Sequence, residues 1–270
     1  MGSTKLERTA HMYDTSKLVS DEVFSYLLSV LPDPKQLKRG RKRVRKEALL
    51  SGILQVLRLG IPWYQIFDCG CSYSSSYRYF KEIQRRGEFH LVQEGLSRTK
   101  TDVTECSSDT TTVTSFGFSD MTGWDGKHKK IGTKVSLISD INGLPVDVLF
   151  GKGSKHDIRF LPEHIENTAG RRKKILNLDK GYTSKELRRD LRNKGIKVNM
   201  ETRSGDYTAK RGPKFGFDKE KYSTRGLIER LNGWIKAFKL LRTRVEYSSS
   251  SFKAFVYLAI IIILVRERQF

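Results

Sequence analysis

Apolar side chains in the first part of the chain recur at the three- and four-residue spacing of amphipathic helices. One such run extends from Val23 to Val30, and Ser20 stands in front of it, where a helix cap is expected. A second run extends from Ala48 to Leu57 and stops at Gly60, a residue typical of the position after a helix. The pattern therefore predicts two helices with a charged segment between them.

Two shorter segments continue this helical region. Ile61-Pro62-Trp63 begins a short helix that reaches Phe67, and Ser74 to Arg86 can form a third helix with a basic surface. Three short helices joined by tight turns, the last of them basic, fit a helix-turn-helix-like DNA-binding domain. Residues 88–104 are expected to form a connector to the next domain.

Beyond this connector the period changes from helical to extended. Residues 107–113 are rich in threonine and favour a strand, whereas residues 116–129 predict a loop. Apolar and polar positions alternate from Lys134 to Leu137 and again from Val146 to Phe150. Asn142-Gly143 between them is a strong hairpin signal. The sequence thus predicts three strands, of which the second and third form an antiparallel hairpin.

Helices and strands then alternate along the chain. A helix is expected at residues 157–167, and residues 174–179 predict a central strand because they are almost continuously apolar. Another helix closes at Gly195, residues 196–200 form the last strand, and a helix begins near Tyr222. The order β-β-β-α-β-α-β-α predicts an α+β or α/β domain, with a mixed five-stranded sheet flanked by helices.

The charge of the chain narrows the choice of partner. Lys and Arg number 51 and Asp and Glu number 30, so the formal charge is 51 − 30 = +21. This excess predicts an anionic partner, with nucleic acid first and an acidic membrane surface second. The basic run Lys38–Lys46 is compatible with a solvated linker or with a DNA contact, and the helices that follow it favour DNA.

Three further features bear on the location of the protein. Cys69, Cys71 and Cys106 are odd in number and lack zinc-finger spacing, which indicates reduced thiols in a cytosolic protein. We expect no signal peptide, and residues 1–12 look like an expression-vector remnant. The apolar run from Ala254 to Val265 is shorter than the roughly 20 residues of a membrane span. A buried helix covering the sheet, with no membrane partner, is therefore expected.

The segment from Tyr222 to Lys236 carries the most specific pattern in the chain. At about 100° per residue, Tyr222, Arg225, Glu229 and Lys236 lie on one side of a helix, opposite an apolar core face. A solvated basic face with an internal ion pair would also produce this pattern. However, the spacing Tyr-x2-Arg-x3-Glu-x6-Lys resembles the signature of the DDE transposases of bacterial insertion sequences, groups four and five. Gly-Ile-Pro-Trp at residues 60–63 is also similar to the amino-terminal domain of these transposases.

The resemblance implies a ribonuclease-H-like catalytic core with three acidic residues. These are Asp109 in the first strand, Asp179 at the end of the central strand before Lys-Gly-Tyr, and Glu229 on the signature helix. They are 70 and 50 positions apart, which resembles the spacing in the family. All three would be metal ligands. We expect Mg²⁺ or Mn²⁺, two ions per site, because both ions prefer hard oxygen ligands and a pair stabilises the entering and leaving oxygens.

Other polar and charged residues are expected to contact DNA or to lie next to the three acidic residues. The residues expected to contact DNA are Tyr222, Arg225, Lys236, Lys127, Lys129, Arg41, Lys42, Arg43, Arg45, Arg78 and Lys81. His156 and Asp157 are expected beside the site, as a second layer around it. Asp120, Asp125 and Asp140 fall in predicted loops or turns, where we expect them to be solvated.

The resemblance, which extends over about residues 20–265, implies a cut-and-paste DNA transposase. It would bind terminal inverted repeats, cleave at the element ends and join the free 3′-hydroxyls to target DNA. A metal-dependent nuclease without strand transfer and a non-catalytic DNA-binding repressor are the alternatives. The expected partner is double-stranded DNA, with a homodimer in the active complex and a cytoplasmic, nucleoid-associated location. The expected divisions are 1–12 (remnant), 13–100 (helical DNA-binding domain) and 101–270 (catalytic domain).

Overall fold

The computed structural model describes residues 15–36, 42–117, 120–201 and 216–266. The expected vector remnant at residues 1–12 lies outside these ranges, as does Arg41.

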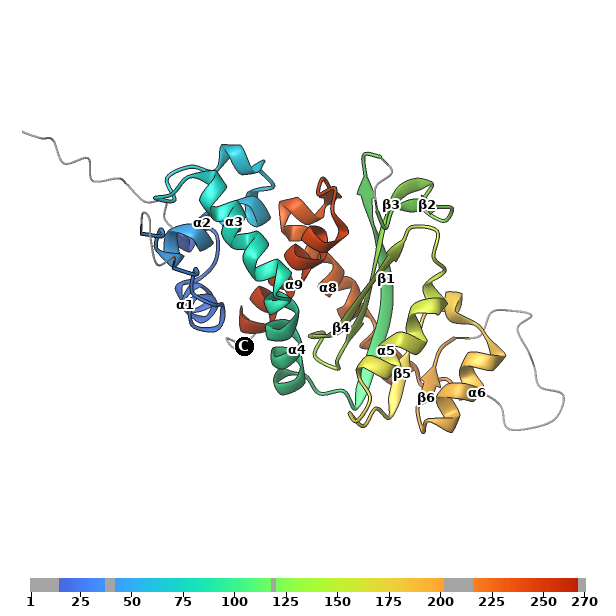
Figure 1. Ribbon diagram of the computed structural model, residues 1–270. Coiled ribbons are helices and arrows are strands. Elements are labelled where there is room, and N and C mark those ends of the chain that lie inside the picture. The colour runs from blue at the N-terminus through green and yellow to red at the C-terminus, as the bar shows by residue number, and fades with distance from the viewer. Residues whose placement is uncertain (1–14, 37–41, 118–119, 202–215, 267–270) are drawn as a thin grey trace, which may run out of the picture.

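A mixed sheet occupies the centre of the second part of the chain (Figure 1). Within the described residues it has seven strands: β1 (Glu105–Ser115), β2 (Gly123–Asp125), β3 (Lys130–Ser139), β4 (Pro145–Lys152), β5 (Ile175–Asn177), β6 (Lys197–Asn199) and β7 (Thr243–Arg244). The five expected strands are present. The additions are β2, which lies in the segment predicted as a loop, and β7, which pairs with the end of β1.

The direction of each strand follows from the connection that precedes it. β3 runs antiparallel to both β1 and β4. The tight turn at Asn142-Gly143 reverses the chain between β3 and β4. Gly143 has φ +84°, and its amide donates to the Asp140 carbonyl at 3.0 Å. β5 and β6 run parallel to β1 and to each other, because helical crossovers precede them. β5 pairs with the first residues of β1, and Asn177 at the end of β5 lies opposite Ser107.

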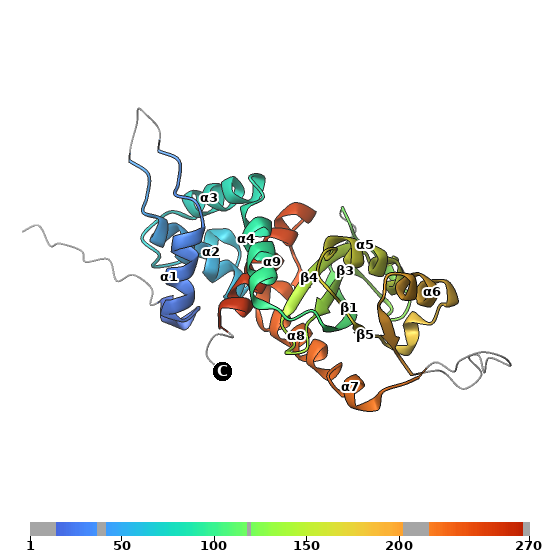
Figure 2. The same ribbon diagram turned by 90° about the horizontal axis from the view of Figure 1, so that it is seen from below.

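Helices cover both faces of the sheet (Figure 2). On one face α5 (Leu161–Asn167) and α6 (Lys185–Asn193) pack against apolar side chains of β3 and β5. On the other face lie α8 (Gly226–Ala237) and α9 (Ser249–Arg266), which pack against β1, β3 and β4. The short elements between them are η3 (Asp157–Phe160), η4 (Lys180–Tyr182), α7 (Lys219–Ser223) and η5 (Lys239–Leu241).

The amino-terminal part is helical, as expected. Its elements are η1 (Thr15–Lys17), α1 (Asp21–Val30), α2 (Lys46–Leu59), η2 (Trp63–Gln65), α3 (Tyr73–Arg85) and α4 (Glu88–Lys100). The Ser20 hydroxyl accepts the Val23 amide at the start of α1, and Gly60 ends α2 in the left-handed region, so both predicted helix ends are confirmed. The short second helix is a single 3₁₀ turn, so the helix-turn-helix arrangement stays a prediction.

Residues 88–104, predicted as a connector to the next domain, are mostly a helix, α4, which the sequence interpretation did not identify. Phe89 and Leu96 are buried, and α4 packs along α9. These two residues, with Val92 between them, follow helical spacing, but so few apolar positions gave a weak signal. The partner helix supplies the burial that stabilises α4.

The carboxy-terminal helix α9 lies between the amino-terminal helices and the sheet (Figure 2). It is apolar on all sides because it is surrounded by protein: Phe255 stacks on Phe80 of α3 with ring centroids 4.4 Å apart. In length and hydropathy α9 also resembles a membrane span, but 72% of this helix is buried inside the protein. One apolar core therefore joins the two predicted domains.

Candidate functional site

The signature segment folds as two helices that meet at Thr224 and Arg225. Tyr222 lies in α7, whereas Arg225 precedes the first residue of α8 and Glu229 lies in the first turn of α8. A single continuous helix was expected. Gly226, a poor helix former, stands at the junction, and Arg225 keeps helical angles (φ −57°, ψ −31°). Tyr222, Arg225 and Glu229 thus remain near one another despite the break.

The apolar side of α8 determines which way its polar side faces. Ile228, Leu231 and Ile235 are buried against Val135 and Leu137 of β3 and neighbouring apolar residues. The predicted core face is therefore confirmed.

Asp109 projects from the middle of β1 toward α8. Its Oδ2 accepts the Nδ2 amide of Asn232, which is on α8, at 2.9 Å. Burial raises the pKa of Asp109 above its ordinary value, and the nearby Glu229 charge acts in the same direction. The Thr110 amide and the charges of Arg225 and Lys127 oppose this shift without cancelling it.

Asp179 follows the end of β5 and stands directly before η4. Its backbone accepts the amide of Tyr182, which closes the turn at 2.9 Å. The Tyr182 side chain is buried on the α5 face, and its hydroxyl lies 3.3 Å from Thr110 Oγ1 on β1. The turn that carries Asp179 is therefore attached to the strand that carries Asp109.

Glu229 forms an ion pair with Arg225, at 3.1 Å between Oε1 and Nη1. The side chain of Glu229 is 61% exposed, whereas that of Arg225 is only 17% exposed. Burial alone would lower the pKa of Arg225, but the interactions with Tyr222, Asp109, Asp179 and Glu229 raise it above its ordinary value. The three predicted acidic residues therefore act on the same guanidinium.

Among the described residues, no three His, Cys, Asp or Glu side chains lie close enough together to hold a metal ion. In kind, the donors suit Mg²⁺ or Mn²⁺, since Asp109, Asp179 and Glu229 offer hard oxygen atoms from three separate elements. Two buried polar atoms at this place also have no hydrogen-bond partner, Arg225 Nε and Asn232 Oδ1. By chemical type the donor set thus suits divalent cations, while the Arg225 guanidinium occupies Glu229.

Asn232 is a polar residue of the site that the sequence interpretation did not identify. It is 8% exposed and lies three residues after Glu229, so both project from neighbouring positions on α8. This spacing was a usable signal, but an asparagine at a helix position does not by itself indicate a contact with Asp109.

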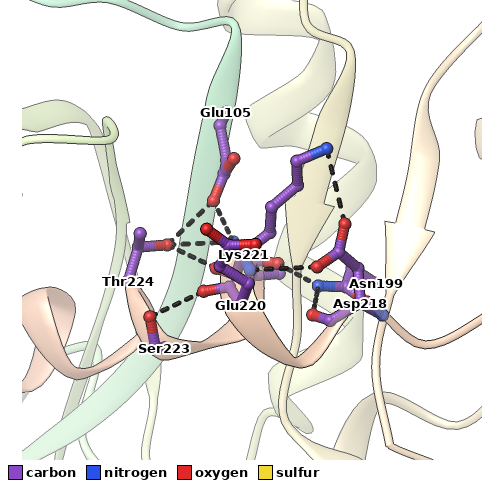
Figure 3. Close-up of polar contacts among 8 residues, drawn as sticks. Glu105, Asn199, Asp218, Glu220, Lys221, Ser223 and Thr224 are labelled. Carbon is purple, nitrogen blue, oxygen red and sulfur yellow. Dashed lines mark hydrogen bonds and ion pairs between the residues drawn. The ribbon is translucent and has the colours of Figure 1, made fainter.

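A second polar cluster lies at the start of α7 and α8 and ties both to the sheet (Figure 3). Asn199 Nδ2 donates to the Asp218 carbonyl at 2.9 Å, and the Asp218 amide donates to Asn199 Oδ1 at 2.9 Å. Asn199 also donates to Asn177 Oδ1 at 2.8 Å, and Asn177 contacts Thr224 and Glu105. Glu105, Asn177 and Asn199 are buried on β1, β5 and β6. None of these residues was predicted to matter.

The residues expected to contact DNA differ in their exposure. Lys42, Arg45, Arg78, Lys127, Lys129 and Lys236 are exposed, and Tyr222 and Arg43 are half-buried. Lys81 is also half-buried and donates to Ser251 Oγ on α9 at 3.1 Å, so its side chain is engaged within the protein.

Asp125 shapes the turn that presents two of these lysines. Its Oδ1 accepts the amides of Lys127 and His128, and its Oδ2 contacts Thr112 Oγ1 and His128 Nδ1. Burial alone would raise the pKa of Asp125, but these hydrogen bonds outweigh it and hold the pKa well below its ordinary value. The expectation that Asp125 is solvated is therefore wrong, since it is 2% exposed.

Asp140 is likewise buried instead of solvated. Its carboxylate accepts the amides of Asn142 and Leu144 in the β3–β4 turn and that of Asp102 after α4. The third of the expected solvated residues, Asp120, has a half-exposed side chain that pairs with the buried Arg244 at 2.9 Å. At Asp125 and Asp140 the turn folds around the carboxylate because it accepts several backbone amides.

His156 and Asp157 lie beside η4 and not among the three carboxylates. His156 is exposed and accepts the Ile158 amide as the cap of η3. Asp157 accepts the Lys134 ammonium at 2.6 Å, and its charge acts on Tyr182. Asp157 thus borders the turn that follows Asp179.

Two sequence families match the chain. The family described as "Transposase DDE domain" matches residues 101–264, and a family described as transposases of the IS4/5 group matches residues 19–92. A curated protein of Burkholderia cepacia, described as a transposase for insertion sequence element IS402, is 29% identical over 136 residues. That match covers 47% of this chain and 60% of the relative, so less than two thirds of the relative is spanned.

A solved structure shares the fold. The piggyBac transposase, determined by cryo-electron microscopy as a synaptic complex with hairpin DNA, superposes with a TM-score of 0.56 at 11% sequence identity. The superposition covers 96% of this chain and 73% of that one. This likeness and the mixed sheet flanked by helices fit a ribonuclease-H-like catalytic domain.

Proposed function

Because the chain belongs to the DDE transposase family, we propose that it is a cut-and-paste transposase. It would bind the terminal inverted repeats of its element, hydrolyse phosphodiesters at the element ends and join the 3′-hydroxyls to target DNA. The observation that carries the proposal is that Asp109 on β1 is hydrogen-bonded to Asn232 on α8, three residues after Glu229, while Tyr182 holds the turn that follows Asp179 against β1. A ribonuclease-H-like sheet with acidic residues at these positions is suited to phosphoryl transfer.

Asp109, Asp179 and Glu229 are the proposed catalytic carboxylates and the ligands of two divalent cations. Such a pair of ions, when bound, stabilises the attacking and departing oxygens of an in-line displacement. Glu229 would hold a cation in place of its ion pair with Arg225, and its side chain, at 61% exposed, is accessible to one. Asp109 is held by Asn232 through Oδ2, which leaves Oδ1 for a ligand.

The cations of the signature segment hold the DNA. Arg225 and Lys236 flank the carboxylates and bind phosphates of the cleaved strand, and Tyr222 stacks on a displaced base or donates to a phosphate. Without the ion pair to Glu229, the Arg225 Nη1 donor would be available to a phosphate. Lys127 and Lys129 at the β2–β3 turn extend the positive surface.

The amino-terminal helices bind the terminal repeats. Arg78 on α3 and the basic residues Lys42 and Arg45 before α2 are exposed and available for phosphate contacts. We assign α2, η2 and α3 to a helix-turn-helix-like unit with α3 as the recognition helix. The active complex is a homodimer, since two element ends must be held together for joining.

The test uses the whole protein and a DNA fragment carrying both ends of the element that encodes it. With Mg²⁺, the protein should cut at the ends and join them to a supercoiled plasmid. Glu229→Gln and Asp179→Asn should abolish cleavage at saturating DNA while DNA binding stays nearly intact, since phosphate contacts are made elsewhere.

Two outcomes count against the proposal. Near wild-type cleavage by Glu229→Gln would exclude Glu229 from the chemistry. The Arg225–Glu229 contact would then be a surface ion pair without a catalytic role. Cleavage without any joining would assign the protein to metal-dependent nucleases without strand transfer.

A further inference from the structure

The helix that carries Glu229 and the strand that carries Asp109 are linked by hydrogen bonds at two places. We propose that Thr224 and Asn232 are positioning residues that set the register of α8 on β1 and thereby bring the three carboxylates into one site. The inference rests on the proposed transposase function, because it explains how that site is assembled. We call the Thr224–Glu105 and Asn232–Asp109 hydrogen bonds the two anchor contacts.

The first anchor contact lies just before α8 (Figure 3). The Thr224 hydroxyl is 2.9 Å from Glu105 Oε1 and 2.7 Å from the Lys221 carbonyl, and its proton is shared between them. Asn177 Nδ2 lies 3.0 Å from the same Glu105 oxygen and 3.2 Å from Thr224 Oγ1. Since Asn177 is two residues before Asp179, this contact joins the elements of all three carboxylates.

The second anchor contact lies farther along both elements. Asn232 Nδ2 donates to Asp109 Oδ2 at 2.9 Å. Glu105 and Asp109 are four residues apart on β1 and therefore project from the same face of the sheet. Thr224 and Asn232 are eight residues apart, with near-helical backbone angles at Thr224 and Arg225.

The lengths of the two spans match. Four residues of a strand cover about 13 Å, and eight residues of a helix cover about 12 Å. Both anchor contacts can therefore form at once without stretching either element. Glu229 lies between them, so its Cα is held from both sides relative to Asp109.

The apolar contacts of α8 do not supply this precision alone. Ile228, Leu231 and Ile235 would remain buried if α8 moved slightly along β1, because burial is non-directional. Hydrogen bonds at two points resist such a movement because their geometry is narrow. Misplacement of a catalytic group by about 1 Å can cost about 100-fold in rate.

The test compares Thr224→Val with Thr224→Ser in the full-length protein. Valine has nearly the shape of threonine but lacks the hydroxyl, whereas serine keeps it. Ser223→Ala is the matched control, because Ser223 is the exposed neighbour and its hydroxyl donates to the Glu220 carbonyl at 2.6 Å. Asn232→Leu removes the second anchor contact. Cleavage rate at saturating DNA, DNA affinity, Mn²⁺ binding to the DNA-free protein and melting temperature are measured for each.

We expect Thr224→Val and Asn232→Leu to cleave about 100-fold more slowly. Both should bind Mn²⁺ more weakly, while DNA affinity stays within a few-fold of wild type. Thr224→Ser and Ser223→Ala should behave like the wild type. Weaker Mn²⁺ binding and normal cleavage by Thr224→Ser would indicate a loss of positioning. A general loss of stability would instead appear in the melting temperature.

Three results would overturn the inference. The first is cleavage by Thr224→Val at the wild-type rate. The second is an equal loss of cleavage rate in Thr224→Val and Thr224→Ser. The third is a cleavage rate that falls in step with the melting temperature across the variants while Mn²⁺ binding is unchanged. Absence of cleavage by the wild type would instead refute the proposed function, so the two failures are distinguishable.

Discussion

Removal of the guanidinium from the carboxylate site should increase the affinity of the DNA-free protein for divalent cations. Arg225 acts on Asp109, Asp179 and Glu229 and is only 17% exposed, so it neutralises part of the charge that would attract Mg²⁺ or Mn²⁺. Arg225→Ala leaves the three carboxylates without this cation. An ion that enters the site then meets less repulsion and stronger attraction.

The magnitude follows from Coulomb's law. A unit positive charge about 5 Å from a divalent cation opposes its binding by about 1.7 kcal/mol at the dielectric constant of water. At low salt this corresponds to more than tenfold in Kd, and partial burial of Arg225 makes it larger. We therefore expect Mn²⁺ to bind Arg225→Ala at least tenfold more tightly than the wild type. Cleavage should nevertheless be slower, because the cut strand loses a phosphate contact.

The assay is a Mn²⁺ titration of the DNA-free protein, followed by water-proton relaxation at low ionic strength. Arg230→Ala is the matched control, since it removes the same charge from α8. The Arg230 side chain stacks over the Trp234 ring at 4.8 Å and donates to the Asn142 carbonyl. Unchanged or weaker Mn²⁺ binding by Arg225→Ala, or an equal gain in Arg230→Ala, would refute the reasoning.

Three further predictions concern stability and DNA binding. Phe255→Ala should lower the free energy of unfolding by about 3–5 kcal/mol. The protein should still unfold in a single urea transition, because α9 lies in the core shared by the amino-terminal helices and the sheet domain. Separate transitions by tryptophan fluorescence and circular dichroism would contradict this. Asp125→Asn should cost about 1–3 kcal/mol at neutral pH. The folded-state pKa of Asp125 is lowered, so its stabilisation is present above the unfolded pKa of about 3.9 and is lost as the pH falls. The difference in urea midpoint between wild type and Asp125→Asn should therefore shrink from pH 7 to pH 3, and a constant difference would contradict the assignment. Arg78→Ala should weaken DNA binding and reduce the salt slope by about one, whereas Lys81→Ala, whose ammonium contacts Ser251, should leave that slope unchanged in filter-binding measurements.

The sequence by itself determined the elements whose signals are local. The cap at Ser20, the stop at Gly60, the Asn142-Gly143 turn and the apolar face of α8 all appear where the pattern predicts them. Each depends on residues within a few positions of one another, so no distant partner is needed to interpret it. The spacing of the Tyr-Arg-Glu-Lys signature is of the same kind, and with the family match it identified the class of protein.

Only the tertiary structure decided which elements and side chains gain a distant partner. α4 has few apolar residues and is stabilised by α9, more than 150 positions later in the chain. Asp125 and Asp140 occupy turns that usually face water, yet both are buried because backbone amides converge on their oxygens.

The candidate site shows the same division. The types of Asp109, Asp179 and Glu229 and their order were readable from the sequence, but the contacts around them, such as that between Asp109 and Asn232, were not. The anchor residue Asn232 meets Asp109 across 123 positions, and Thr224 meets Glu105 across 119. No local pattern encodes such pairs, since a hydrogen bond between distant residues depends on how the sheet and the helix pack.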